Sequence, residues 1–316
     1  MKRVLTGIII VILILIVLPY VMVPSVIHES ISTTSSTTQR SAQRYLLDDH
    51  QWPSWWPRSP SKVIRGLSAT RYFYYNGYAF RLSQQFMSGI ELTSDHSLDS
   101  IKNLITIVPI SKDTVKLVWE FQEKSSFNPI TRFQQYNKAK RLKKDVGGII
   151  QALATFLNDD LNTYGITISR TTITDSFLVA TKTILKDEPA IADIYQQVDV
   201  LKQYASASGA QVTNAPMLNK RRIDSSQIEM MVALPINKAL SGKGSIIYRE
   251  LPAGKLLVAE VQGGPARVRE AFRQLENYLV EHKYESPAIP FESLVTNRQQ
   301  ESDTTKWVTR IYYPIF

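Results

Sequence analysis

The first strong pattern along the chain is an uncharged run over residues 5–23 that follows Lys2 and Arg3. A helix of that length extends roughly 28 Å, close to the hydrocarbon thickness of about 30 Å. We therefore predict that residues 1–24 form an uncleaved single-pass anchor. The two basic residues would stay on the cytoplasmic side, which places the body in the periplasm at the inner membrane. The alternative is a cleaved signal peptide, but no small-residue cleavage pattern follows the run.

Residues 25–165 show several short runs in which apolar and polar positions partly alternate, as in antiparallel strands. Asn76-Gly77, which lies inside the run at 71–80, is a strong hairpin signal. A helical pattern then runs from Arg132 to Asn158, with apolar residues at three- and four-residue steps. We predict an antiparallel sheet closed by one long helix. A first strand is expected at 27–32 and a short helix at 39–48, and the apolar runs that indicate the further strands are 71–80, 82–92, 104–108 and 114–121.

From residue 166 onward the pattern repeats itself. Phe177-Leu178-Val179-Ala180 is echoed by Leu256-Leu257-Val258-Ala259. Each apolar run would form a strand, followed by a helix, a proline-containing loop and a closing strand, so we predict two strand–helix–strand–strand copies. The two copies would span about 171–237 and 246–316, and their helices would begin at Pro189-Ala190 and Pro265-Ala266. The whole chain is predicted to belong to the α+β class.

The second copy carries motifs that resemble the GyrI-like small-molecule-binding family, which includes effector-binding domains of AraC- and multidrug-type regulators. The matching motifs are Tyr248-Arg249-Glu250-Leu251-Pro252-Ala253-Gly254, Gly263-Gly264, Phe291-Glu292 and Tyr313-Pro314-Ile315. The resemblance implies a ligand-binding domain over residues 166–316. The chain departs from the family at Ala266, where a tyrosine is common, and at Glu292-Ser293-Leu294, where Glu-x-Tyr is common.

Residues 25–165 resemble, in the order of their elements, the helix-grip fold of the polyketide cyclase/START-type superfamily (SRPBCC). The resemblance is carried by Trp52 to Pro57, the strand series, Asn128-Pro129 with Arg132, and the long last helix. Both families hold ligands, so the resemblance implies a cavity in each domain type, and the sequence does not determine whether residues 25–165 keep theirs. Trp52, Trp55 and Trp56 could guard the mouth of that cavity or plug the core, and the sequence leaves both interpretations open.

Five residues are candidates for a ligand site in the C-terminal domain: Glu292, Trp307, Tyr313, Tyr248 and Glu260. The resemblance places Glu292 where the family has a carboxylate facing a central cleft. A carboxylate in an apolar cleft favours a cationic or hydrogen-bond-donating ligand. Trp307 and Tyr313 share one face of the predicted last strand, and their rings suit cations and flat apolar ligands. The alternatives to a ligand site are that Glu292 is an exposed loop residue and that Trp307 and Tyr313 are ordinary core residues.

The composition and the absence of known motifs exclude several kinds of catalytic and metal site. The chain has no cysteine, which excludes disulfides, thiol nucleophiles and cysteine-bound metals. Its four histidines lack metal-ligand spacing, and no nucleophile elbow or phosphate-binding loop is present. The net charge is +9, but no DNA-binding element accompanies it, so we expect no direct nucleic-acid partner. The basic run at 138–144 would be a solvated helix face or a contact with anionic lipid. We expect no cofactor and no metal.

These observations predict a membrane-anchored, non-catalytic protein that binds a small apolar or cationic molecule between the two C-terminal copies, as a sensor or by sequestering it. Glu292→Ala would then weaken the binding of lipophilic cations. A second hypothesis is a hydrolase of reactive electrophiles with Glu292 as general base. A third is a structural scaffold whose pockets are filled by their own side chains. The ligand's identity and the oligomeric state are not determined by the sequence.

Overall fold

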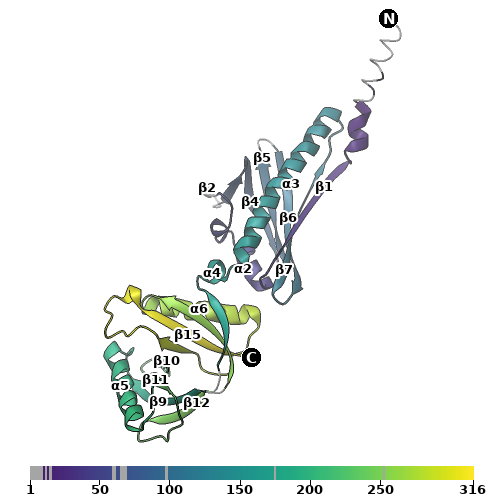
Figure 1. The fold of residues 1–316 in the computed structure, drawn as a ribbon. Coiled ribbons are helices and arrows are strands. Elements are labelled where there is room, and N and C mark those ends of the chain that lie inside the picture. Colours follow the sequence, from purple (N-terminus) through teal and green to yellow (C-terminus); the bar gives the residue numbers. More distant parts are fainter. Residues whose placement is uncertain are drawn as a thin grey trace. The chain divides into compact units, whose positions relative to one another are not determined.

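The fold is taken from a computed structural model that describes residues 10, 13, 16–58, 62–64, 70–96, 99–173, 176–251 and 253–316. The chain divides into two compact units, Met1–Asp159 and Asp160–Phe316 (Figure 1). Each unit has its own antiparallel sheet and its own buried core. The predicted α+β class is confirmed.

Nine of the 19 residues of the predicted anchor at 5–23 lie outside the described residues. In the part of the chain that the structure describes, no helix has both the length and the apolar character needed to cross a membrane. Residues 16–22 are helical, and the chain then enters the first strand of unit 1. The guanidinium of Arg132 fixes this entry, because its Nε and Nη2 atoms donate to the carbonyl oxygen of Val23 at 3.0 and 2.6 Å.

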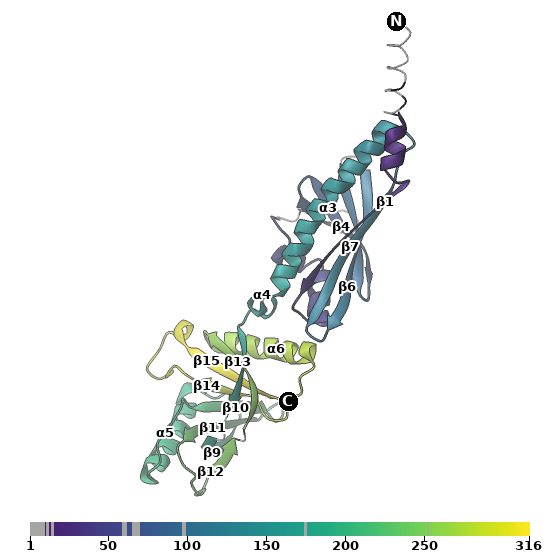
Figure 2. The ribbon, with the colours of Figure 1, turned by 45° about the vertical axis from the view of Figure 1, so that its right-hand side comes forward.

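Unit 1 is a seven-stranded antiparallel sheet in the order β1-β7-β6-β5-β4-β3-β2 (Figures 1 and 2). Its strands are β1 (Val26–Ser35), β2 (Lys62–Ile64), β3 (Thr70–Tyr75), β4 (Tyr78–Phe86), β5 (Gly89–His96), β6 (Asp99–Ser111) and β7 (Thr114–Lys124). Its helices are α2 (Gln39–Leu47), the short 3-10 helix η1 (Trp52–Ser54) and α3 (Pro129–Leu157). Consecutive strands pair from β2 to β7, and β1 joins the sheet beside β7.

Local sequence accounts for several of these boundaries. Asn76 and Gly77 form the predicted β3–β4 turn with positive φ angles of 46° and 86°. The side chain of Asn128 accepts hydrogen bonds from the first turn of α3, and Pro129 is the first helical residue. The predicted single strand at 82–92 is wrong, because the chain turns between β4 and β5 within it. The exposed side chain of Met87 at this turn is apolar, so the polarity pattern hides the turn.

The three neighbouring tryptophans of unit 1 lie in its core. Trp52 is fully buried, its ring stacks on Trp56 with centroids 5.6 Å apart, and it lies 4.8 Å from the ring of Phe73. Trp55 is also buried. Each indole N–H donates to a backbone carbonyl oxygen, at 2.9 to 3.3 Å. Burying the polar end of a tryptophan requires such a partner, so these rings are core residues with satisfied donors.

Unit 2 is an eight-stranded antiparallel sheet in the order β12-β9-β11-β10-β14-β15-β13-β8. Its strands are β8 (Ile168–Ile173), β9 (Ser176–Leu185), β10 (Met217–Arg222), β11 (Ile228–Ile236), β12 (Ile247–Leu251), β13 (Gly254–Gln262), β14 (Phe291–Leu294) and β15 (Val308–Ile315). Its helices are α4 (Asp160–Tyr164), α5 (Ile191–Ala207), α6 (Pro265–His282) and the 3-10 helix η2 (Thr304–Lys306). One core forms between α5 and the sheet, and a second between α6 and the sheet.

The two copies of the sequence repeat appear as β9-α5-β10-β11 and β13-α6-β14-β15. They meet where β10 pairs with β14, through Met217 opposite Ser293 and Leu218 opposite Glu292. The strand before each copy pairs with the other copy: β8 lies beside β13, and β12 lies beside β9. The copies therefore share one sheet, and its short central junction forms the floor between them.

The two repeated helices begin differently from one another. Pro265 is the first residue of α6, as predicted. Pro189 instead precedes α5, which begins at Ile191 after Ala190. The backbone N–H of Ala190 donates to the carboxylate of Asp193 at 2.8 Å, and this contact sets the start of α5 two residues beyond the proline.

Candidate functional site

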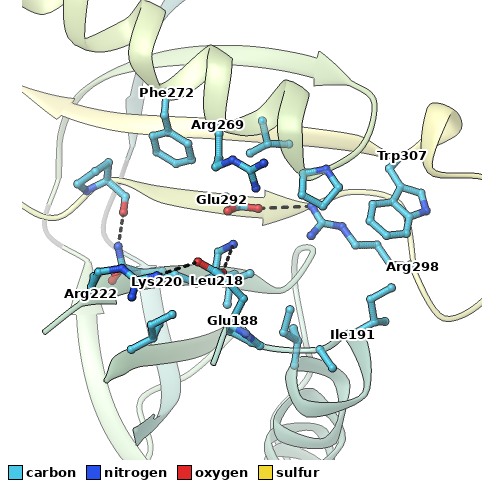
Figure 3. Close-up of a pocket in the computed structure, with 18 of the residues that line it drawn as sticks. Glu188, Ile191, Leu218, Lys220, Arg222, Arg269, Phe272, Glu292, Arg298 and Trp307 are labelled. Carbon is cyan, nitrogen blue, oxygen red and sulfur yellow. Dashed lines mark hydrogen bonds and ion pairs between the residues drawn. The ribbon is translucent and has the colours of Figure 1, made fainter. Parts of the chain in front are cut away.

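A cleft of about 690 Å³ lies between the two copies on the face of the unit 2 sheet that carries α5 and α6 (Figure 3). The first turns of α5 form one wall, and α6 forms the opposite wall. Strands β10 and β14, which join the copies, contribute to its floor. The volume is within the range of about 300–1,000 Å³ common for small-molecule sites.

Glu292 lies in the floor of this cleft. It is the second residue of β14, paired with Leu218 on one side and Ile311 on the other. Leu294, two residues further along the strand, packs in the core under α5, so alternation directs Glu292 to the same face. The residue is 6% exposed. The structure therefore places Glu292 in the lining of the cleft, and its role toward a ligand stays a prediction.

Glu292 already has a partner of opposite charge. The Nη2 atom of Arg298 lies 3.4 Å from its Oε2 atom, and both side chains are 7% exposed (Figure 3). The same Nη2 donates to the Oγ1 atom of Thr309 at 2.8 Å. The guanidinium carbon lies 5.0 Å from the ring centroid of Trp307. The backbone N–H of Arg298 donates to the hydroxyl of Tyr195 at 2.8 Å.

Sequence reasoning missed Arg298. The residue belongs to the loop after β14, where the sequence has neither a regular spacing of apolar residues nor a recognised motif that would indicate a functional role. A signal was nonetheless available, because a carboxylate buried in an apolar site requires a nearby cation. Arg298 is only six residues after Glu292. Sequence distance alone could not decide among the basic residues that the fold could bring near.

The two predicted rings also line the cleft. Trp307 is 4% exposed, and its indole N–H donates to the carbonyl oxygen of Glu301 at 2.8 Å. Tyr313 packs edge-on against Phe272 of α6, with centroids 6.4 Å apart. Burial, with a smaller contribution from the Glu276 carboxylate 3.4 Å from its hydroxyl oxygen, raises the pKa of Tyr313 to about 12. This hydroxyl is therefore a protonated hydrogen-bond donor at neutral pH.

Two other sequence candidates lie elsewhere in unit 2. Tyr248 is on β12, where its hydroxyl donates to the Oε1 atom of Glu250 at 2.7 Å. Glu260 is on β13, with its side chain 57% exposed and its Oε2 atom 2.8 Å from the Nε atom of Arg310. Neither residue lines the cleft. The fold thus brings together Glu292, Trp307 and Tyr313 and leaves the other two apart.

The lining of the cleft, floor and rim together, has more cations than anions. Among the described residues, five cationic and three acidic side chains line it. Glu188 faces Lys220 at 3.5 Å and Arg222 at 3.9 Å. The five cations are Lys220, Arg222, Arg269, Arg273 and Arg298. Arg269 extends from α6 toward Glu292 (Figure 3), and it has no ion pair or hydrogen bond with any residue that the structure describes.

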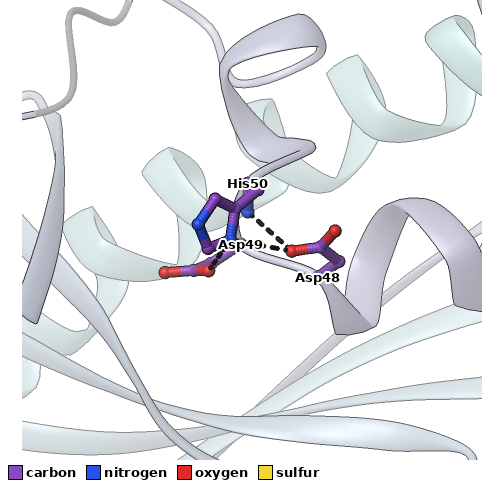
Figure 4. A group of neighbouring side chains, drawn as sticks. All are labelled: Asp48, Asp49 and His50. Carbon is purple, nitrogen blue, oxygen red and sulfur yellow. Dashed lines mark hydrogen bonds and ion pairs between the residues drawn. The ribbon is translucent and has the colours of Figure 1, made fainter.

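A second polar cluster lies in unit 1, directly after α2. The Nδ1 atom of His50 is 3.1 Å from Asp48 Oδ1 and 3.2 Å from Asp49 Oδ1 (Figure 4). The backbone N–H of His50 donates to the same Asp48 oxygen at 2.9 Å, which closes a side-chain turn. The imidazole is 73% exposed. The geometry of this turn accounts for the grouping of the three side chains.

Comparison with known families covers most of unit 2. Residues 185–315 match the family model described as the GyrI-like small molecule binding domain. Residues 185–315 are a GyrI-like domain. This confirms the family predicted for the C-terminal half, while the SRPBCC resemblance of residues 25–165 stays a prediction. None of the curated proteins matches the chain.

Three solved structures show some similarity to this chain, and each covers 48% of it. The EcmrR C-terminal domain has 17% identity, 98% of its own chain covered and a TM-score of 0.42. SAV2435 bound to tetraphenylphosphonium has 16% identity, 94% covered and a TM-score of 0.32. A hydrolase from Listeria innocua has 8% identity, 92% covered and a TM-score of 0.38.

Proposed function

We propose that the cleft of the GyrI-like domain binds a small amphipathic molecule without converting it. The observation that carries the proposal is the composition of the cleft. Phe272, Trp307 and Tyr313 give it an aromatic side, while charged residues stand at its rim. Burial of an apolar body against these rings contributes about 25 cal/mol per Å² of apolar surface, and the polar groups orient the molecule.

The contact between Glu292 and Arg298 supports binding over turnover. A general base must accept a proton from water or substrate with a free, correctly placed oxygen. The Oε2 atom of Glu292 is occupied by Arg298 at 3.4 Å. The positive charge of Arg298 beside this carboxylate favours its ionised form and makes it a weaker proton acceptor, which disfavours the hydrolase hypothesis, whereas binding needs no proton transfer.

The proposal can be tested with an uncharged fluorescent probe, N-phenyl-1-naphthylamine, titrated into the full-length protein in nonionic detergent with the detergent background subtracted. Phe272→Ala removes part of the aromatic wall and should weaken binding at least about fivefold, which corresponds to about 1 kcal/mol. Phe127→Ala is the matched control, because Phe127 lies in unit 1 and is 91% exposed. Equal affinity in the wild type and both variants would contradict binding in this cleft.

We further propose that residues 5–23 attach the protein to a membrane, with the body on the periplasmic side. The uncharged sequence supports this, as do exposed apolar side chains beside the described end of the segment. Val21 and Met22 are 77% and 61% exposed, and Ile130 at the start of α3 is 69% exposed. The hydroxyl of Tyr20 donates to the Phe127 carbonyl oxygen. Release of the full-length protein from membranes by an alkaline carbonate wash would refute the attachment.

A further inference from the structure

Arg298 occupies the position that a bound cation would take. Its guanidinium lies between the carboxylate of Glu292, at 3.4 Å, and the ring of Trp307, at 5.0 Å. A carboxylate and an aromatic face are the two groups that attract a ligand cation in a dry site. Here both are already used by a residue of the chain.

This internal cation is held firmly in place. Its side chain is 7% exposed, Thr309 accepts its hydrogen bond at 2.8 Å, and Tyr195 accepts from its backbone N–H at 2.8 Å. A ligand cation would have to displace a buried guanidinium or share Glu292 with it. Both alternatives leave charge imperfectly compensated in a buried site, which is costly.

The remaining charges of the cleft also favour a negative group. Arg269 extends toward Glu292 and is free of ion pairs within the described part of the chain. The Nε atom of Arg298 is buried and has no hydrogen-bond partner among the described residues.

We propose that Arg298 is an internal counter-ion that determines the charge specificity of the cleft, so that its ligand is an amphipathic anion and lipophilic cations are excluded. This inference rests on the proposed function and names the ligand class of the same cleft. The apolar body of the anion would lie against the aromatic side, and its negative group would face Arg269 and the rim cations. Arg298 acts here as a positioning and specificity residue.

Two probes of nearly the same shape and opposite charge test the proposal. Tetraphenylborate and tetraphenylphosphonium are titrated separately into the full-length protein, in the same nonionic detergent, with protein-free samples as background. The wild type should bind the anion at least about tenfold more tightly than the cation. A tenfold ratio corresponds to about 1.4 kcal/mol.

Variants then assign the preference to Arg298. Arg298→Gln frees Glu292 and should raise affinity for tetraphenylphosphonium at least about tenfold. Arg298→Lys keeps the charge and should keep the cation excluded. Arg298→Gln combined with Glu292→Gln should lose the gain, which separates a new cation site from a general loosening of the cleft. Arg249→Gln removes an exposed cation on β12 outside the cleft and should change either affinity less than about twofold.

The outcomes separate the two proposals. If the wild type binds both ions equally, or binds the cation more tightly, the specificity inference is overturned while ligand binding in the cleft stands. The inference is also overturned if Arg298→Gln folds, as judged by its circular dichroism, and gains no cation affinity. If the wild type and all variants bind neither ion nor the neutral probe, the proposed function itself fails.

Discussion

Replacing Glu292 by glutamine should cost unit 2 about 3 kcal/mol of stability, and replacing Arg298 by glutamine should cost a similar amount. Glu292→Gln keeps the shape of the side chain and removes its charge, whereas Arg298→Gln removes the charge together with the guanidinium and its hydrogen bond to Thr309. Both side chains are 7% exposed. Each single variant therefore leaves the other ion of the pair buried and without its opposite charge. Removing one partner of a buried pair typically costs about 3–5 kcal/mol, because the other ion stays buried and uncompensated.

The magnitude follows from the geometry. At 3.4 Å and an effective dielectric constant of about 20, the attraction between the two charges is about 5 kcal/mol. Desolvation of both ions offsets several kcal/mol of this attraction. We therefore expect a net coupling of about 2 kcal/mol, so that the double variant loses little more than either single variant.

Thermal unfolding of the full-length protein measures this coupling in a double-mutant cycle. Trp307 is the only one of the five tryptophans that belongs to unit 2, so its resonance in protein labelled with 5-fluorotryptophan reports the unfolding of that unit. A loss of 3 kcal/mol should lower its midpoint by about 6–12 °C. Additive effects, with a coupling below about 0.5 kcal/mol, would show that the two charges do not stabilise each other and would refute the reasoning.

Three further predictions concern unit 1. Burial raises the pKa of Glu29, but the ammonium groups of Lys140 at 2.8 Å and a second lysine at 2.7 Å outweigh it and hold the pKa below its ordinary value. The stability this provides is present above the ordinary carboxyl pKa and is lost as the pH falls through the lowered one. Glu29→Gln should thus cost about 1 kcal/mol at pH 7 in urea titrations, and the curves of variant and wild type should converge in acid. Trp52→Ala should cost about 3–5 kcal/mol in the same assay, and a loss below 1 kcal/mol would contradict its place in the core. Gly89→Ala should cost at least about 2 kcal/mol, because its Cβ would lie 2.2 Å from the Ile105 carbonyl oxygen. An unchanged urea midpoint in that variant would show that the strands separate more easily than the structure indicates.

Local sequence determined the elements whose causes are local. Asn76-Gly77 specifies a hairpin because both residues accept positive φ angles. Asn128-Pro129 specifies a helix start because the side-chain cap and the fixed proline φ act within one turn. The repeated strands and helices of unit 2 could be predicted for the same reason, because the spacing of apolar residues within each element reflects which of its positions are buried.

Tertiary structure alone decided the contacts that depend on chain path and register. The exchange of β8 and β12 between the two copies has no local signature, and it is this shared sheet that leaves a cleft above the β10–β14 junction. Burial of Glu292 could be anticipated from its motif. Its pairing with Arg298 could not, because the loop after β14 is aperiodic and only its path in space brings the guanidinium back over the strand. The sequence pattern thus predicts a carboxylate in a cleft. The path of the loop after β14 brings the Arg298 guanidinium to this carboxylate, and the proposed charge specificity depends on that contact.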